Sequence, residues 1–298
     1  VLVTRFSALG ALDTSFGSNG RFISSSNEKG QAQDVVIDSS GRIIFTGSIV
    51  GTLAPDAAIV GRLTRNGQLD STFATLGYFI NEFNGDAQLD AIDIRPNGNL
   101  VAIGTHVVSY STGPQNALIV CLTDQGALDS TCNSVGWDFL SDFPNDVYAD
   151  DVFVTPDNKI LFSGASDDGN PRPFVMRLNH NGTPDNSFAT SGTWRGSALT
   201  GRMYSVTIQS DGRILAAGQL DAQGTMSVGV VRLANTVVVT TTTTTDAPLV
   251  TTSTTVPPST IAPEQLPATG NQFDSLTAAL LLTALGSIFV AARRRSSH

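Results

Sequence analysis

Basic residues are scarce in this sequence of 298 residues, which has 17 Lys and Arg against 26 Asp and Glu. After Asn235 three acids balance three arginines, so the whole net charge of −9 belongs to the preceding residues. Nucleic-acid binding requires basic patches that displace counterions, and adsorption to anionic lipid requires positive charge. The composition therefore excludes both classes, and we expect no nucleic-acid partner.

Catalytic signatures are also few. There are only three histidines, His106, His180 and His298, and no two of them have the spacing of metal ligands. No G-x-S-x-G elbow, P-loop or dinucleotide fingerprint is present. We predict that no cofactor is bound and that none of these histidines is catalytic.

Sustained helical periodicity is absent before residue 276. Instead, two motifs alternate, each returning after about 55–59 residues. The first reads Arg-Leu, then Gly-x-Leu-Asp, then Phe and Gly. Its copies begin at Arg5, Arg62, Cys121, Arg177 and Arg232, and the last copy dissolves into threonines.

The second motif consists of two β-rich runs joined by a tight turn. Its copies span residues 34–47, 91–104, 151–164 and 205–218, with Asx, Pro and Gly at the turns. Gly and Asn accept positive φ and Pro presets φ, so these are hairpin signals. Together the two motifs predict about four strands in a repeat of about 57 residues, as in the blades of a β-propeller.

The pattern R-L-x-x-x-G-x-L-D-x-x-F, followed by D-G-K/R-I-hydrophobic-x-x-G, resembles the delta-60 repeat family of β-propeller-like bacterial proteins. The resemblance covers residues 1 to about 235 and implies an all-β fold, with about four to five four-stranded blades present. It often goes with a surface location, but it implies no activity.

The repeats predict four first-and-second strand pairs, five Arg-Leu strands and four closing strands. A ring could close if the strand near Arg21 joined the last blade beside Val230 to Leu233. The strand near Val3 would then be surplus. We favour the other interpretation, an incomplete or strained propeller with repeats missing upstream.

Residues that recur in every repeat are more often scaffold than catalytic. We expect the leucines to fill the gap between blades, the aspartates to cap the following turn, and the phenylalanines to pack under that loop. A catalytic role for the repeated aspartates is the alternative. The residues concerned are Leu12, Leu69 and Leu128; Asp13, Asp70, Asp129 and Asp185; and Phe16, Phe73 and Phe188.

The third copy differs, because its Arg and Phe positions hold the only two cysteines, Cys121 and Cys132. If the Arg stem normally lies over the Phe ring, the two positions touch and a disulfide can replace that contact. Export makes oxidation plausible. We predict a disulfide, with two unpaired core cysteines as the alternative.

The C-terminus carries the pentapeptide Leu266-Pro267-Ala268-Thr269-Gly270, an uncharged apolar run over 276–292, and Arg293-Arg294-Arg295. This order resembles the LPXTG sorting signal of surface proteins of Gram-positive bacteria, with an actinobacterial source expected. The resemblance implies sortase cleavage between Thr269 and Gly270, attachment to peptidoglycan, and a cell-wall location.

As a helix, residues 276–292 would span about 26 Å, which is marginal for a bilayer. We predict transient membrane insertion, stopped by the three arginines. A permanent membrane anchor is the alternative. A sorting signal demands export, yet the chain starts at Val1 without a signal peptide. We therefore expect a fragment or a processed front end.

The composition changes abruptly over residues 236–265, which are rich in Thr and Pro. Such a segment cannot bury enough apolar surface to fold, so we predict a disordered stalk. The alternative, a strand of the last blade, applies only to about 236–240. The predicted domains are thus repeats over 1–235, a stalk over 236–265 and a sorting signal over 266–298.

One acid cluster suggests a calcium site, because hard oxygen ligands suit Ca²⁺. It contains Asp142, Asp146, Asp150 and Asp151, and its spacing matches no EF-hand. Acidic loops are usually just solvated, so these residues are weak candidates and we expect no metal.

Two function classes remain. The first is a non-enzymatic surface module that binds an extracellular glycan or protein through the loops of a propeller face. The second is a wall-anchored glycan hydrolase or lyase with carboxylates at the mouth of the propeller. Two carboxylates about 5–10 Å apart in one pocket would favour the enzyme. We favour the binding module.

Overall fold

The computed structural model describes residues 1–24, 29–50, 55–108, 113–140, 143, 146–222 and 225–233, all within the compact unit that includes Val1–Val238. The predicted stalk, apolar run and sorting signal lie outside these residues. Within the described residues all the regular elements are strands, so the all-β prediction is confirmed. Among them, no helix is long and apolar enough to cross a membrane.

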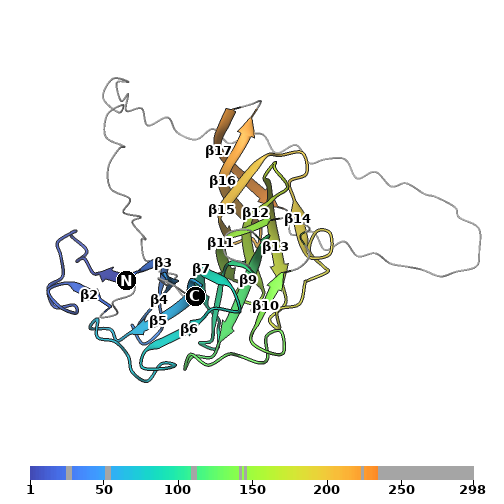
Figure 1. Cartoon of the computed structure of the whole chain (residues 1–298). Coiled ribbons are helices and arrows are strands. Elements are labelled where there is room, and N and C mark those ends of the chain that lie inside the picture. Colours follow the sequence, from blue (N-terminus) through green and yellow to red (C-terminus); the bar gives the residue numbers. More distant parts are fainter. Residues whose placement is uncertain are drawn as a thin grey trace, which may run out of the picture. The chain divides into compact units, whose positions relative to one another are not determined.

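In the described part of the chain, seventeen strands form five antiparallel sheets, which follow one another in chain order (Figure 1). Sheet 1 contains β1(Leu2–Thr4) and β2(Arg21–Ile23). Sheet 2 contains β3(Lys29–Ile37), β4(Ile43–Val50), β5(Ala57–Leu63) and β6(Tyr78–Asn81). Sheet 3 contains β7(Asp86–Ile94), β8(Leu100–Val107), β9(Gln115–Leu122) and β10(Trp137–Leu140). Sheet 4 contains β11(Asp146–Val154), β12(Ile160–Asp167), β13(Arg172–Leu178) and β14(Thr193–Arg195). Sheet 5 contains β15(Gly201–Ile208), β16(Ile214–Ala222) and β17(Thr225–Leu233).

This inventory matches the predicted one strand for strand. Sheets 2, 3 and 4 are complete blades. Within the described residues, sheet 1 has the third and fourth strands of a blade, and sheet 5 has the first three. The closing strand Arg21–Ile23 pairs with Leu2–Thr4 of its own repeat and not with the last sheet. The ring-closing alternative is therefore wrong for this structure.

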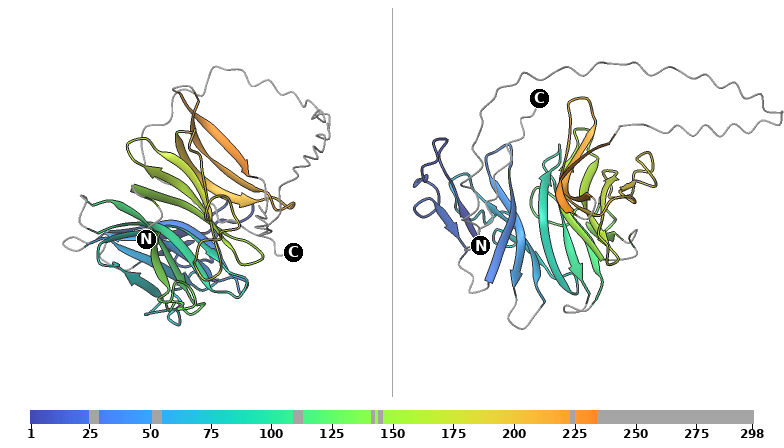
Figure 2. Two further views of the ribbon diagram at one scale, coloured as in Figure 1. Left: turned by 90° about the vertical axis from the view of Figure 1, so that its right-hand side faces the viewer. Right: turned by 90° about the horizontal axis from the view of Figure 1, so that it is seen from above.

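Neighbouring sheets pack face to face, and their inner surfaces form four apolar cores between successive sheets (Figure 2). Successive side chains of a strand point to opposite faces of its sheet, so each sheet contributes alternate residues to the core on either side of it. The core between sheets 2 and 3, for example, joins Ile44 and Val60 to Ile92 and Leu118. Stability of this array therefore comes from contacts between nearest neighbours.

Every first strand contains a β-bulge at the same place, opposite a glycine of the second strand. At Gly104 an added Cβ would overlap the carbonyl oxygen of Gln88, and Gly47, Gly164 and Gly218 face the same obstacle. The glycine lets the two backbones approach closely at the bulge. The extra residue of each bulge is Gln33, Asp90, Asp150 or Tyr204, and the last three belong to the candidate site described below.

Candidate functional site

The repeated Arg, Asp and Phe form one network in each regular copy. Arg62 donates from Nε to Asp70 (2.8 Å), its guanidinium lies 4.7 Å from the centre of the Phe73 ring, and Asp70 caps the turn by accepting from the Thr72 amide. Copies starting at Arg5 and Arg177 repeat the arrangement. The predicted turn-capping role of the aspartates and the Arg–Phe contact are confirmed.

The same network joins each repeat to the next. The Nη1 of Arg5 donates to the carbonyl of Arg65 (2.6 Å), and the Nη1 of Arg62 donates to the carbonyl of Asp124 (2.5 Å). Both acceptors occupy the same position in the following first-motif turn. The guanidinium groups therefore act as links between successive sheets, which is a scaffold role.

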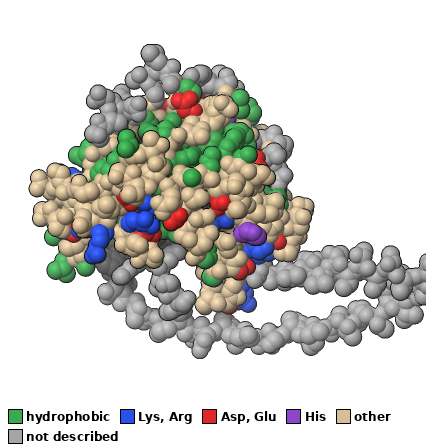
Figure 3. All heavy atoms as spheres, turned by 90° about the horizontal axis from the view of Figure 1, so that it is seen from below, with side chains coloured by type: hydrophobic (Ala, Val, Ile, Leu, Met, Phe, Trp, Pro, Cys, Tyr) green, Lys and Arg blue, Asp and Glu red, His purple; other side chains and the backbone are tan. Residues whose placement is uncertain are grey.

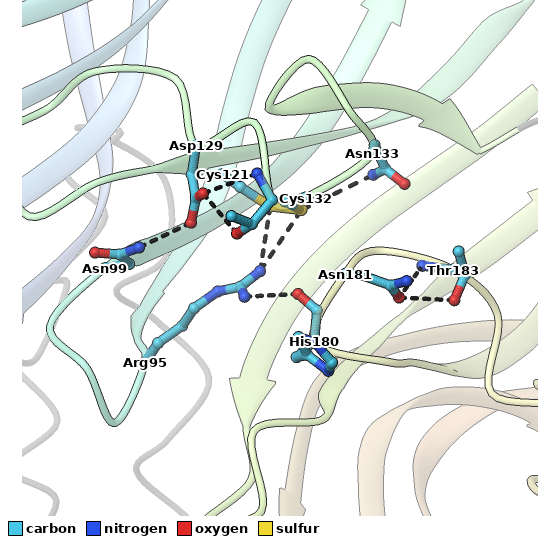
Figure 4. The surroundings of a disulfide bond; sticks show 10 residues. Arg95, Asn99, Cys121, Asp129, Cys132, Asn133, His180, Asn181 and Thr183 are labelled. Atoms are coloured by element: carbon cyan, nitrogen blue, oxygen red, sulfur yellow. Dashed lines mark hydrogen bonds between the residues drawn. A yellow bond between two sulfur atoms is a disulfide. The ribbon is translucent and has the colours of Figure 1, made fainter.

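The third copy contains the predicted disulfide between Cys121 and Cys132 (Figure 4). Both cysteines are fully buried. The missing guanidinium is supplied from elsewhere: Arg95, which follows β7, places Nη2 at 3.3 Å from Sγ of Cys121 and donates from Nη1 to the carbonyl of His180 (2.7 Å). His180 occupies the position of Arg65 and Asp124, so Arg95 restores the link to the next sheet.

Sequence reasoning missed Arg95. The equivalent residues in the other copies are Asp38, Thr155 and Gln209. A basic residue at this position occurs only in the copy that lacks the motif arginine, and that coincidence could have pointed to its role. In the third copy a cysteine stands at the Arg position of the motif, so Asp129 has no motif arginine to bind. It accepts a hydrogen bond from Nδ2 of Asn99 instead (2.8 Å). Burial tends to raise the pKa of Asp129, but its hydrogen bonds from Thr131 and Asn99 and the charge of Arg95 hold the pKa below its usual value.

A second group of polar residues lies where the first strands of successive sheets meet, since β3 lies against β7, β7 against β11 and β11 against β15. Aspartates in these strands accept backbone N–H groups from the next sheet: Asp34 from Ile92 (3.0 Å), Asp93 from Val154 (2.7 Å), and Asp151 from Val206 (2.8 Å). These three carboxylates are therefore structural.

We call the polar residues around the bulges of sheets 3 to 5 the inner rim: Gln88, Asp90, Tyr148, Asp150, Arg202 and Tyr204. Arg202 binds Asp150 through two hydrogen bonds (2.6 and 2.7 Å). Its guanidinium also lies 4.5 Å from the ring centre of Tyr148 and 5.6 Å from that of Tyr204. Three sheets thus contribute to one cluster that contains aromatic faces, a fixed cation and carboxylates.

Asp90 differs from the other rim carboxylate, because it contacts an amide and no cation. Gln88 Nε2 donates to its Oδ1. Burial, with a further contribution from the charge of Asp150, raises the pKa of Asp90 to about 6. Burial likewise raises the pKa of Asp150, although Arg202 opposes that shift. Perturbed carboxyl groups of this kind concentrate at functional sites.

Asp90→Asn is expected to stabilise the protein at pH 7.5 by about 1–2 kcal/mol. This is less than the free energy that corresponds to the whole pKa shift, because solvent screens the partly exposed side chain. The folded state holds its proton up to about pH 6, whereas the ordinary value is 3.8. Between pH 3.8 and about pH 6 the folded protein binds this proton and the unfolded chain does not, so folding stability falls as the pH rises across this range. The stabilising contribution is complete below pH 3.8 and is lost above about pH 6. Urea unfolding at several pH values measures the effect. The difference between variant and wild type should vanish near pH 4, and a constant difference would contradict the assignment.

The predicted calcium candidates are not brought together as a ligand set. Asp146 accepts from the amide of Gln115 (2.8 Å), Asp150 binds Arg202, and Asp151 accepts from Val206. Asp142 lies outside the described residues. No group of three or more His, Cys, Asp or Glu side chains within the described part of the chain could hold a metal ion.

His106 is buried in β8, where it stacks on Phe139 with ring centres 4.3 Å apart. Burial lowers its pKa, so the ring stays neutral at physiological pH. His180 contributes only its carbonyl to the link with Arg95. His298 and the LPATG pentapeptide lie outside the described residues.

A cavity of about 240 Å³ lies between sheets 4 and 5, away from the inner rim. Its lining includes Lys159 and Arg177, but both cations are bound to Asp185 (3.2 and 2.8 Å). Both cations in the lining therefore already have a carboxylate partner. On the face shown in Figure 3, acidic and basic side chains are interspersed.

Family models match two segments of the chain. Residues 155–188 match a family described as a domain of unknown function (DUF5122) beta-propeller. Residues 258–297 match the LPXTG cell wall anchor motif. The solved structures that resemble the chain include an unknown function protein from Dyadobacter fermentans DSM 18053, with 12% identity and a TM-score of 0.42, covering 70% of this chain and 67% of that chain. None of the curated proteins compared with the chain matches it.

The sheets, the repeated network and the matched segment define a protein with β-propeller-type repeats, as the resemblance predicted. The anchor motif identifies it further as a secreted surface protein that a sortase processes and attaches to peptidoglycan.

Proposed function

We propose that the chain is an adhesin-like binding module that holds an extracellular glycan at the inner rim. The observation that supports this is the convergence of Tyr148, Tyr204, Arg202 and Asp90 from three sheets. Ligand sites usually combine aromatic surface with a few polar groups that fix orientation. Sugar rings present apolar faces to aromatic side chains and hydroxyl groups to carboxylates, amides and guanidinium groups.

An enzymatic glycosidase function would require two carboxylates with separate roles. Asp90 has the raised pKa of a general acid, but Asp150 is bound through both oxygens to Arg202. That ion pair fixes Asp150 as a positioning group for Arg202. The geometry therefore favours binding without turnover over hydrolysis.

We further propose that Leu266, Pro267, Ala268, Thr269 and Gly270 form the sortase site, with cleavage after Thr269. Residues 276–292, with Arg293, Arg294 and Arg295 behind them, would hold the chain in the membrane until cleavage. Residues 236–265 would then act as a spacer between the wall and the repeats over 1–235. Mass spectrometry of wall fragments should find Thr269 joined to peptidoglycan.

Glycan-array binding by the full chain tests the ligand class. Tyr204 is half exposed, so Tyr204→Ala should weaken binding of the selected glycan at least tenfold without changing the melting temperature. Leu76→Ala, at an exposed loop position remote from the rim, is the matched control. The proposal is wrong if no glycan is bound, if Tyr204→Ala binds normally, or if the bound glycan is cleaved.

A further inference from the structure

The bulges give the inner rim a repeating geometry. Each of sheets 3, 4 and 5 contributes its bulge residue and the residue two positions before it, which are Gln88 and Asp90, Tyr148 and Asp150, and Arg202 and Tyr204. At the junction of sheets 4 and 5 the earlier residue of sheet 5 binds the bulge residue of sheet 4, because Arg202 donates two hydrogen bonds to Asp150 (2.6 and 2.7 Å). The carboxylate at this junction is therefore paired with a cation.

The junction of sheets 3 and 4 has different residues at the equivalent positions. Its first strands, β7 and β11, contact each other as β11 and β15 do. Asp90 takes the place of Asp150, but Tyr148 takes the place of Arg202. Among the described residues no Lys, Arg or His forms an ion pair with Asp90, and its Oδ1 accepts a hydrogen bond from the Gln88 amide. Asp90 thus keeps the carboxylate of the repeated arrangement and lacks its cation.

This difference leaves the rim with an uncompensated negative charge. Because the pKa of Asp90 is about 6, its side chain is mostly ionised at about pH 6.5. The charged groups that face it are Asp150 and Arg202, so two carboxylates then stand against one guanidinium. A buried charge without a counter-ion lowers folding stability, a loss that functional sites commonly show. The rim therefore attracts a positively charged group and repels an anionic sugar.

We infer that the glycan held at the inner rim contains an amino sugar with a free amine, and that its ammonium group binds the Asp90 carboxylate. The inference rests on the function proposed above and names the ligand class of that same site. The ammonium would give Asp90 the cation that Arg202 gives Asp150. The ring of Tyr148, at the position equivalent to Arg202, adds an aromatic surface of the kind that attracts cations. An N-acetylated sugar has no such charge, so the rim should distinguish the two forms.

Isothermal titration of the full chain with a glucosamine oligosaccharide, and with its fully N-acetylated counterpart of the same length, tests the inference. The measurement is made at about pH 6.5, where Asp90 is mostly ionised and the sugar amines still bind protons. The wild type should bind the free-amine form about tenfold more tightly, the usual effect of one hydrogen bond between charged groups.

Two variants should remove this preference in opposite ways. Asp90→Asn removes the carboxylate, so its affinity for the free-amine form should fall about tenfold, to that of the acetylated form. Gln88→Lys keeps the carboxylate but places an ammonium of the protein beside it, because the Gln88 side chain already reaches Asp90. Asp138→Asn is the matched control, since it changes the net charge equally but lies exposed on β10, at the opposite edge of sheet 3 from β7. It should keep the preference.

Circular dichroism melting establishes that each variant is folded, and Gln88→Arg replaces Gln88→Lys if the latter is not. Equal binding of the two oligosaccharides by the wild type would overturn the inference and leave the proposed glycan function intact. A preference that persists in Asp90→Asn, or that Asp138→Asn also loses, would overturn it as well. Binding of neither oligosaccharide would do the same, and the wider glycan array then decides the proposed function separately.

Discussion

Arg62→Ala is expected to lower the free energy of unfolding by about 3–5 kcal/mol, the usual effect of removing one partner from a buried ion pair. Arg62 is almost fully buried, and its ion pair with Asp70 is 2.8 Å long. The substitution leaves the Asp70 carboxylate without its cation and also removes the link to the Asp124 carbonyl and the contact with Phe73. Chemical denaturation with fluorescence detection gives the value.

Arg5→Ala is the matched control, because it removes the same motif residue from an exposed setting. The Arg5–Asp13 pair has the same length, but about a third of its surface is accessible to solvent. Exposed pairs contribute at most about 1 kcal/mol. If the two substitutions lower the free energy of unfolding equally, burial of the ion pair does not explain its contribution to stability.

Replacing both cysteines by alanine is expected to cost about 3 kcal/mol from loop entropy alone. The two residues are 11 positions apart and both are fully buried. The double variant additionally leaves the Nη2 of Arg95 facing apolar side chains in place of sulfur. Thermal unfolding with and without reductant measures the effect in wild type and variant.

A consensus repair separates the covalent bond from the packing. The triple variant Cys121→Arg, Cys132→Phe and Arg95→Thr recreates the network that surrounds Arg177 and Phe188 in sheet 4, where Thr155 occupies the position of Arg95. It should recover most of the lost stability and become insensitive to reductant. A repaired protein as unstable as the double-alanine variant would show that the network cannot replace the disulfide.

The strand inventory and the disulfide could be predicted from the sequence because they depend on local signals. Turn residues and alternating apolar residues recur in every copy, and the two cysteines occupy positions that otherwise hold an Arg and a Phe in contact. Arg95 could not be placed in this way, since its role depends on which strands become neighbours across repeats. From the sequence, Asp150 was only a weak calcium candidate, and nothing in the pattern indicated its pairing with Arg202.

The inner rim was equally inaccessible to pattern reasoning. Asp90, Asp150 and Tyr204 are separated by more than fifty residues each, and a β-bulge sets the position of each one. Nothing in a single repeat distinguishes a bulge residue from an ordinary strand residue. The raised pKa of Asp90 comes mainly from burial, with a smaller contribution from Asp150, and both depend on how the sheets pack.

The guanidinium links have a consequence for how such genes can change length. The links described run from Arg5 to the carbonyl of Arg65, from Arg62 to that of Asp124, and from Arg95 to that of His180, so each one crosses from one repeat to the next. A duplication or deletion of one whole period between regular copies keeps an arginine beside a carbonyl acceptor, whereas a change of half a period separates the two. Lineages should therefore differ in multiples of the full period and seldom in fractions.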